Sequence, residues 1–168
     1  ASNLKTSKYR DGTDILNITS GNDWIQTQSA AWCYYDNNAS NDALYGKLYN
    51  WLAIDNSKGI CPDGWHVASA SEWDALASSV GNNPALKLSS TSGWFNNNNG
   101  TNEYGFNAKP GGQRTALGFE RITRRGTWWT SSKQGSSPAI RFMDHSSGFV
   151  FSDTDFISSG FSCRCVKD

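Results

Sequence analysis

One short segment, residues 69–81, constrains the fold more than any other part of the sequence. Ser69 followed by Glu72 is a capping box, in which the hydroxyl accepts a backbone N–H at the helix start and the carboxylate reaches back to the cap. Apolar residues then recur at helical spacing, and Gly81 ends the pattern. The segment predicts an amphipathic helix whose apolar face must pack on another element; that face consists of Trp73, Leu76, Ala77 and Val80.

The stretch "CPDGWHVASASEWDAL", residues 61–76, places Cys61 and His66 close to Glu72. Three such residue types together invite a catalytic or metal-binding interpretation. However, residues 62–64 (Pro-Asp-Gly) form a turn signal, and the apolar residues on either side of His66 alternate with it as on a short strand. Because Glu72 already has a role in the cap, we interpret the segment as scaffold and His66 as a hydrogen-bonded structural residue.

A second helix is expected upstream, from about Asp42 to Ile54, ending near residues 56–59. Its apolar positions recur at three- and four-residue spacing: Leu44, Leu48, Trp51 and Leu52, with Tyr45 as a further candidate. After residue 82 the helical periodicity is lost, and "AKPGGQR" is expected to be a tight turn.

The last third of the chain has the pattern of strands joined by Ser, Gly and Asp turns: "RGTWWTSS", "AIRFMDH", "GFVFSD" and "GFSCRCV". We find no internal repeat and no linker. The sequence therefore predicts a single α+β domain, residues 1–168, with two helices packed on a loop-rich antiparallel sheet.

The charge balance excludes some classes of partner. Fifteen basic residues match fifteen acidic ones, so the formal net charge is zero. A protein that binds nucleic acid by phosphate attraction needs a concentrated basic face, and the cluster of Arg121, Arg124 and Arg125 has the pattern of a solvated loop. No apolar run reaches the ~18 residues of a transmembrane helix. We expect neither a nucleic-acid partner nor a transmembrane segment.

The four cysteines indicate a disulfide framework in an oxidising compartment. Cys163 and Cys165 lie two apart on an expected strand, where neighbouring cysteines on one face rarely bridge each other. Each is therefore expected to pair upstream, with Cys33 and Cys61, and spacing alone leaves open which pairs with which.

Six segments resemble one known family in sequence and in order: "NLKTSKYRDGTDI", "YGKLYNW", "CPDGWHVASASEWDAL", "GFNAKPGG", "WWTSS" and "GFSCRCVKD". They resemble the Fibrobacter succinogenes major paralogous domain of bacterial surface proteins, from the first residues to the last. The resemblance implies a C-type lectin-like fold, shared with the formylglycine-generating enzymes, and no established enzymatic activity. It also implies an extracellular or cell-surface location, on secreted proteins or lipoproteins of Bacteroidetes and Fibrobacteres, and excision from a longer chain.

The resemblance also implies a disulfide pairing. Cys61 and Cys165 stand at the family's two cysteine positions, so they are expected to form the main bridge. Cys163 stands where the family usually has valine, and we expect it to bridge Cys33 as an accessory link.

A lectin-like domain of this kind is expected to bind a glycan or protein ligand without catalysis, as an adhesion module. Its long loops and late strands, here residues 92–104 and about 133–158, are where ligands commonly bind. The candidate ligand-binding residues combine aromatic rings with polar groups: Trp94, Phe95, Asn97, Arg141, His145, Phe149, Phe151, Asp153, Asp155 and Phe156.

Several alternatives remain open at this stage. The Cys163–Cys165 pair could support a copper- or thiol-dependent oxidase like the formylglycine-generating enzymes. Asp153 and Asp155 could flank a glycosidic bond, or the chain could be a ligand-free module of a surface appendage. No cofactor is expected except Ca²⁺, whose preferred oxygen ligands are offered by Asn96 to Asn99, Asn102, Glu103, Asp144, Asp153 and Asp155.

Overall fold

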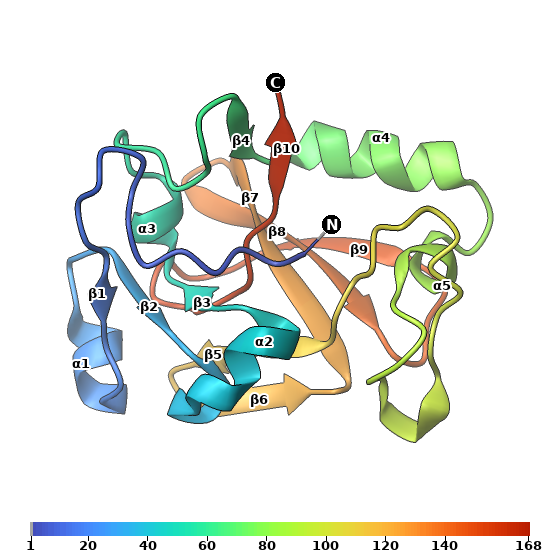
Figure 1. Cartoon of the computed structure of the whole chain (residues 1–168), viewed down its shortest axis with the longest axis horizontal. Coiled ribbons are helices and arrows are strands. Elements are labelled where there is room, and N and C mark those ends of the chain that lie inside the picture. The colour runs from blue at the N-terminus through green and yellow to red at the C-terminus, as the bar shows by residue number, and fades with distance from the viewer. Residues whose placement is uncertain (1) are drawn as a thin grey trace.

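The structure is a computed structural model that describes residues 2–168, and its architecture is α+β (Figure 1). The centre is a five-stranded sheet in the order β6-β5-β7-β8-β9. Its strands are β5 (Gly111–Thr115), β6 (Gly118–Ile122), β7 (Arg125–Gln134), β8 (Ser137–Asp144) and β9 (Val150–Thr154). All neighbouring strands pair antiparallel except β5 and β7, which meet in a parallel bridge at Gly112 and Gly126.

Two smaller sheets complete the strand pairing. The first has the order β1-β2-β3, made of β1 (Leu16–Asn17), β2 (Ala31–Cys33) and β3 (Leu48–Tyr49). The second pairs β4 (Trp65–Val67) with β10 (Cys165–Lys167), so the C-terminal segment lies beside the start of the capped helix (Figure 1).

The helices are α1 (Gly21–Gln26), α2 (Asp42–Tyr45), α3 (Trp51–Ile54), α4 (Ala70–Val80) and α5 (Pro84–Leu88). The capping box is confirmed: Ser69 caps α4, both reciprocal hydrogen bonds with Glu72 are present, and Gly81 is the C-cap. The short helix α5 falls where helical periodicity was expected to be lost. It begins at Pro84, a residue whose fixed φ suits the first turn of a helix.

The expected helix from Asp42 to Ile54 is wrong, because the segment divides into α2, β3 and α3. Gly46 ends α2 with a φ of 73°, and a Cβ at that position would lie 2.8 Å from the Leu4 carbonyl oxygen. The chain then pairs as β3 with β2, with Tyr49 opposite Trp32, before Asn50 caps α3. Strand pairing with a distant segment therefore overrides the local helical pattern.

The expected tight turn at "AKPGGQR" is also wrong, because Gly111 and Gly112 open strand β5. Gly112 has a φ of 67°, and a Cβ there would lie 2.6 Å from the Glu120 carbonyl oxygen. The glycine pair thus allows a close approach of β6 instead of a chain reversal.

The core is rich in tryptophan. Trp128 and Trp129 follow each other on β7 and are both fully buried, yet they point into separate clusters. Trp129 packs against Trp51 and Phe161, while Trp128 packs against Trp73 of α4. Alternation along the strand therefore ties α3 to one face of β7 and α4 to the other.

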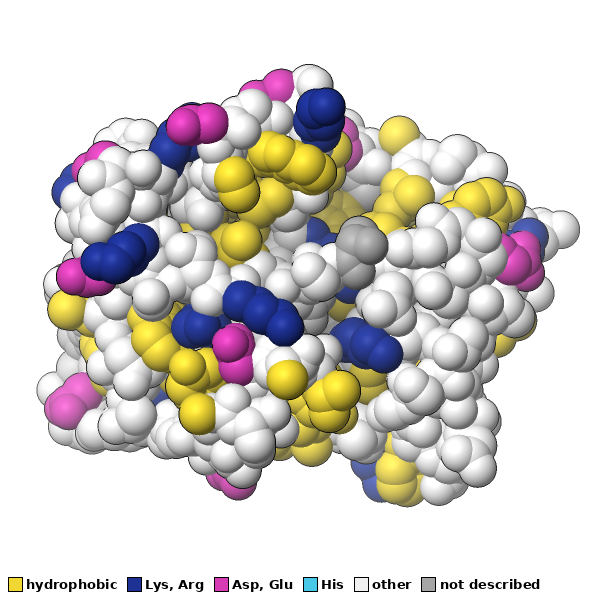
Figure 2. All heavy atoms as spheres, viewed as in Figure 1, with side chains coloured by type: hydrophobic (Ala, Val, Ile, Leu, Met, Phe, Trp, Pro, Cys, Tyr) yellow, Lys and Arg dark blue, Asp and Glu magenta, His cyan; other side chains and the backbone are white. Residues whose placement is uncertain are grey.

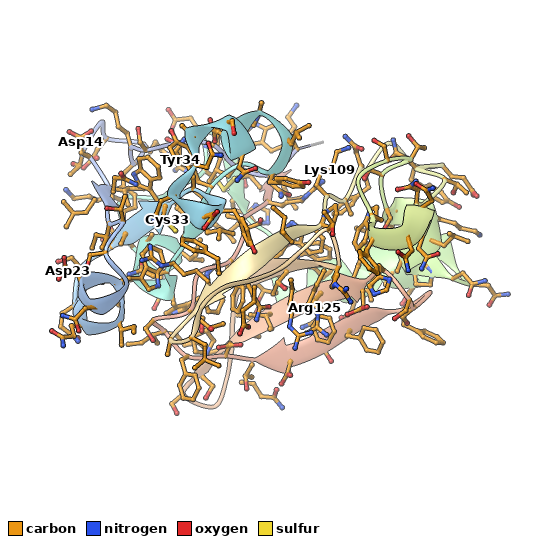
Figure 3. All side chains as sticks on the ribbon, turned by 90° about the horizontal axis from the view of Figure 1, so that it is seen from below. Asp14, Asp23, Cys33, Tyr34, Lys109 and Arg125 are labelled. Carbon is orange, nitrogen blue, oxygen red and sulfur yellow. A yellow bond between two sulfur atoms is a disulfide. The ribbon has the colours of Figure 1, made fainter. Side chains whose placement is uncertain are left out.

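A disulfide joins Cys61 to Cys165, with a Cα–Cα distance of 5.9 Å, as expected from the family resemblance. The expected Cys33–Cys163 bridge is wrong, since both residues are free and buried. Cys33 packs beside Trp24 and Leu48, in the half of the molecule where Figure 3 shows it near Tyr34, whereas Cys163 packs in a different cluster with Cys61. None of the helices within residues 2–168 is long and apolar enough to cross a membrane.

Candidate functional site

The strongest candidate site is a polar hollow of about 520 Å³, here called the Asn cleft, between the loop of residues 92–104 and the turn that joins β8 to β9. Helix α5 forms its base. The lining consists mostly of amide, hydroxyl and small side chains: Asn83, Ala85, Leu86, Ser89, Trp94, Asn97, Asn98, Asn99, Gly100, Asp144, His145, Ser146, Ser147 and Gly148. Of the residues predicted from sequence, it brings together Trp94, Asn97 and His145.

The loop side of the cleft is held by its own asparagines. Asn96 and Asn97 both have positive φ, 54° and 57°, which asparagine tolerates better than most residues. The Asn99 side-chain oxygen accepts the Trp94 backbone N–H at 3.0 Å. Trp94 itself is buried, and its indole N–H donates to the Ser90 hydroxyl at 3.2 Å, so it anchors the loop and offers no stacking surface.

The turn side of the cleft is organised by Asp144. Its carboxylate accepts hydrogen bonds from the Arg125 guanidinium at 3.1 Å and from the Ser146 hydroxyl at 3.1 Å. Burial acts to raise the pKa of Asp144, but the hydrogen bonds from Arg125 and Ser146 outweigh it, and the pKa is lowered. Asp144 is therefore ionised at neutral pH, and both of its oxygens are already in use.

His145 and Phe95 join the two sides of the cleft. The side-chain nitrogen of Asn98 lies 3.4 Å from His145 Nδ1, and the Phe95 ring packs edge-on against the imidazole at 5.3 Å. The Arg124 guanidinium also packs on the Phe95 ring, 3.8 Å from the ring centre. The cleft is thus preorganised by contacts between loop and turn.

Some polar groups of the cleft are not used by the fold. The side-chain amides of Asn83 and Asn97 make no hydrogen bond with residues 2–168, and the Ser147 hydroxyl only accepts, from the Phe149 backbone N–H. Sequence reasoning missed Asn83 and Ser147. A signal existed for Asn83, since an asparagine before a proline favours a turn, and it adopts a φ of 56°.

Exposed phenylalanines adjoin the cleft. Phe149 follows the cleft-lining Gly148, is 64% exposed, and lies edge-on to Phe151 at 6.3 Å. Phe151 stacks on Phe142 across the β8–β9 pair at 4.9 Å. Arg125, seen in the sheet in Figure 3, lies 4.1 Å from the Phe142 ring centre, so the residue that binds Asp144 also connects the cleft to these rings.

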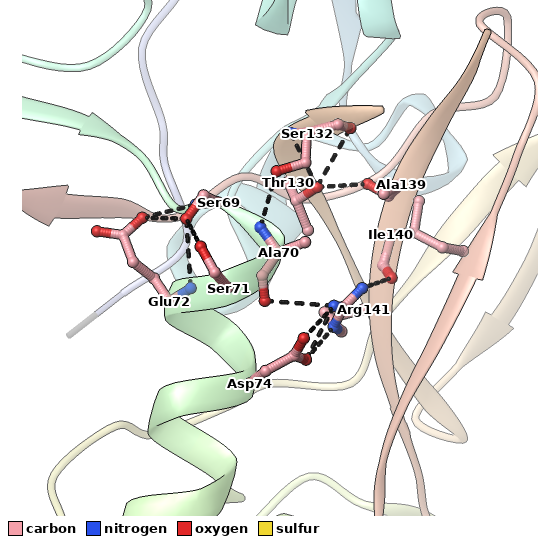
Figure 4. Close-up of polar contacts among 10 residues, drawn as sticks. All are labelled: Ser69, Ala70, Ser71, Glu72, Asp74, Thr130, Ser132, Ala139, Ile140 and Arg141. Carbon is pink, nitrogen blue, oxygen red and sulfur yellow. Dashed lines mark hydrogen bonds and ion pairs between the residues drawn. The ribbon is translucent and has the colours of Figure 1, made fainter. Parts of the chain in front are cut away.

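Arg141 does not belong to this site, contrary to the prediction. Its buried guanidinium binds the Asp74 carboxylate of α4 at 2.8 and 3.0 Å and donates to the Ala70 carbonyl (Figure 4). This side chain joins α4 to β8, which makes it part of the scaffold.

Asp153, Asp155 and Phe156 lie at the other end of β9. Asp153 is opposite Ile140, and the Asp155 backbone N–H donates to Pro138, near the start of β8, whereas Asp144 ends that strand. Asp155 also accepts a hydrogen bond from Ser159 at 2.6 Å.

The predicted calcium ligands fall in separate places: Asn97 to Asn99 and Asp144 line the Asn cleft, whereas Asp153 and Asp155 lie at the other end of β9. Among residues 2–168, the one group of three or more Cys, His, Asp or Glu side chains close enough to share a metal ion consists of Cys61, Cys163 and Cys165. The Asn102 oxygen is used by the Asn107 backbone N–H, and Glu103 by Thr101. Asp144 is the one carboxylate that lines the cleft together with these asparagines in the part of the chain that the structure describes.

The three cysteine sulfurs lie within 4.8 Å of one another. However, Cys61 and Cys165 share the disulfide, and burial raises the pKa of the Cys163 thiol to about 12. Redox catalysis and soft-metal binding both need a thiolate. In the disulfide-bonded protein, Cys163 is the one thiol of this cluster, and burial disfavours its thiolate.

His66 is held as the sequence predicts, by hydrogen bonds. Its Nε2 lies 2.8 Å from a Glu72 oxygen, and its Nδ1 lies 2.6 Å from an Asp168 oxygen, a partner that sequence spacing could not indicate. Hydrogen bonds to Asp168 and then to Glu72 raise the pKa of His66. The Ser69 backbone N–H is the largest cause of a lowered pKa at Glu72. This arrangement fastens the C-terminal strand to the start of α4, where the Ser69 hydroxyl also donates to Glu72 at 2.7 Å.

Comparison with known proteins identifies the family of the chain. No curated protein and no solved structure matches the chain significantly. The family model described as the Fibrobacter succinogenes major domain matches residues 1–167, nearly the entire sequence. The chain therefore belongs to the Fibrobacter succinogenes major domain family.

Proposed function

We propose that this protein is a noncatalytic binding module of a bacterial surface or secreted protein, and that it recognises a glycan at the Asn cleft. One observation carries the proposal: loop and turn enclose a hollow of about 520 Å³ in which the Asn83 and Asn97 amides are free of the fold. A side-chain amide presents a donor and an acceptor together, which matches a pair of neighbouring sugar hydroxyls.

The aromatic neighbour supports the same ligand class. Phe149 follows the cleft-lining Gly148 and is 64% exposed, so its ring could lie against the apolar face of a pyranose. Trp94 and Phe95 hold the loop in place before any ligand arrives. Such preorganisation lowers the ordering cost of binding.

The proposal takes the α+β arrangement to be a C-type lectin-like fold, as the family resemblance implies. In that fold, ligands commonly bind at the long loops and late strands, which here form the Asn cleft. The Cys61–Cys165 disulfide is compatible with an oxidising, extracellular location.

A glycan array probed with the purified chain, with and without Ca²⁺, tests this function. We expect a restricted set of glycans to bind equally well in Ca²⁺ and in EDTA, because both oxygens of Asp144 are occupied by protein donors. Loss of binding in EDTA would contradict this arrangement of the cleft. No binding to any glycan would contradict the proposal itself and favour a ligand-free surface module.

Three variants localise the site. Asn97→Gly, which keeps the positive φ of 57° accessible, and Phe149→Ala should each weaken glycan binding about 10-fold or more. Phe156→Ala is the matched control, since Phe156 is also a predicted, largely exposed aromatic but lies beyond the other end of β9. Equal losses in all three variants would place the ligand elsewhere. Binding that persists on a deglycosylated surface protein would favour a protein ligand instead.

A further inference from the structure

A second, larger hollow has walls of a different chemical character from those of the Asn cleft. It measures about 860 Å³ and is here called the apolar groove. The N-terminal residues 2–5, helix α4, Phe106 and strand β10 surround it. Figure 2 shows the surface hollowed beside the C-terminal strand, with hydrophobic side chains at its rim and basic side chains close by. Its size falls in the range of small-molecule sites, about 300–1,000 Å³.

The walls of the groove are mainly apolar. They include Leu4, Pro62, Trp65, Ala68, Trp73, Ala75, Leu76, Phe106 and Val166. Trp65 is 39% exposed, and Leu76, on the apolar face of α4, is only partly covered. The indole N–H of Trp73 is buried and has no acceptor among residues 2–168. An unpaired buried donor is unfavourable, so a ligand acceptor that reached this indole would be favourable.

The charged groups of the groove are predominantly basic. They are Lys5, Arg164 and Lys167 against the single acid Glu72. Glu72 is already bound by Ser69 and His66. The Lys167 ammonium has no partner within residues 2–168, and Lys5 donates only to the Ala43 carbonyl. The groove therefore has positive charge that the fold does not neutralise.

Arg164 is the most telling of these groups. It is 4% exposed, and its guanidinium donates to the Asn3 side-chain oxygen and to the Phe106 and Asn107 carbonyls, all neutral acceptors. No carboxylate within residues 2–168 pairs with it, and burial lowers its pKa to about 9. A buried charge without a counter-ion is unfavourable.

A second buried arginine provides a comparison. Arg114 donates to the carbonyls of Ile18, Thr19 and Ser20 and has no acid partner among residues 2–168, so this fold can satisfy a guanidinium without an acid. Arg114 lies inside the core between Trp24 and Phe119. Arg164 instead lies in the wall of an open groove whose rim carries two further cations.

We propose that the apolar groove binds an amphipathic carboxylate, a molecule with an extended apolar body and one anionic end. The apolar body would lie along Trp65, Leu76 and Val166, and the carboxylate would lie at the basic residues. This second site is independent of the glycan proposal, because the two hollows share no lining residue.

Titration with dodecanoate below its micelle concentration tests the proposal. Calorimetry and tryptophan fluorescence measure the binding. Dodecan-1-ol has the same chain without the charge, and dodecyltrimethylammonium has the opposite charge. We expect saturable 1:1 binding of dodecanoate, at least 10-fold tighter than that of the alcohol, and weakened by salt. No saturable binding would overturn the proposal, and equal affinity for all three compounds would overturn its anionic part.

Two pairs of variants locate the site. Ala75→Phe fills the groove from an exposed position of α4 and should abolish dodecanoate binding, while Ser78→Phe, exposed on the same helix but outside the lining, should not. Lys167→Gln should weaken dodecanoate several-fold and leave dodecan-1-ol unchanged, with Lys133→Gln as the control. If Ala75→Phe binds dodecanoate normally, the groove is not the site. Glycan binding should be unaffected by Ala75→Phe, so failure of one proposal is distinguishable from failure of the other.

Discussion

The Asn cleft and the apolar groove differ in what forms their walls. The cleft is made by a loop and a turn whose conformation depends on asparagines with positive φ and on side-chain contacts such as Phe95 with His145. The groove is made largely by regular elements, helix α4 and strand β10, with residues 2–5 and Phe106 completing it, and the Cys61–Cys165 disulfide fastens β10. Stability and ligand chemistry are therefore distributed differently. The shape of the groove depends on the scaffold. Side chains of the cleft, in contrast, can be substituted without disturbing the scaffold.

Removal of the disulfide should have the largest effect and should affect the groove first. The bridge closes a loop with a sequence separation of 104, for which the chain-entropy model gives about 4–5 kcal/mol. We expect the Cys61→Ala/Cys165→Ala variant to lose about 3–5 kcal/mol of unfolding free energy in urea. At temperatures where it remains folded, dodecanoate binding should fall more than glycan binding.

The control for that experiment is the pair of free cysteines. Cys33 and Cys163 are buried, so their thiols should react with a thiol reagent only after unfolding. Cys33→Ala should cost about 1–2 kcal/mol through lost packing alone. A loss below about 1 kcal/mol on removing the bridge would show that the disulfide does not stabilise the groove wall.

The next largest effect concerns the contact between α4 and the central sheet. Asp74→Asn removes the charge that binds the buried Arg141 guanidinium. Hydrogen bonds to charged groups contribute about 1.5–3 kcal/mol, but Asp74 is 64% exposed and partly screened, so we expect a loss of about 1–2 kcal/mol.

Urea unfolding measures this loss, and Asp153→Asn, an exposed carboxylate on β9, should change stability by less than about 0.5 kcal/mol. Glycan binding by Asp74→Asn should match that of the unmodified chain. A selective loss of glycan binding at full stability would return Arg141 to the ligand site and contradict its role as scaffold.

The same division between regions explains what the sequence could predict. Two signals that act within a few residues were reliable: Ser69 with Glu72 marked the helix start, and alternation around His66 marked β4. The helical pattern across residues 42–54 failed because Gly46 must approach Leu4 closely and β3 must pair with β2. Nothing in the local sequence reports either contact.

Whether the sequence could predict the residues of a candidate site depends on how close in the sequence the contacting residues are. The loop and turn that line the Asn cleft were named in advance from the family resemblance and from the polar and aromatic residues that cluster there in sequence. Arg141 looked equally suitable, since its partner Asp74 is 67 residues away. The apolar groove gave no signal, because residues 2–5, α4 and β10 come together only in the folded chain.

The smallest effect uses the two histidines, one in each region. His66 joins α4 to Asp168 beside the groove, and His145 lies in the cleft. Because the folded protein raises the pKa of His66, the protonated form favours folding. Its contribution is fully present below the unfolded pKa of about 6.5 and is lost as pH rises through the raised folded value. Stability attributable to His66 should therefore decline on the alkaline side of that window.

An NMR titration of the imidazole resonances measures this directly. Asp168→Asn removes the largest cause of the shift, so the titration of His66 should move toward lower pH, while Asp153→Asn should leave it unchanged. Dodecanoate should perturb the His66 resonances and a bound glycan those of His145. If either ligand perturbed both rings equally, the two hollows would be coupled, and the separation between a scaffold-built groove and a loop-built cleft would not hold.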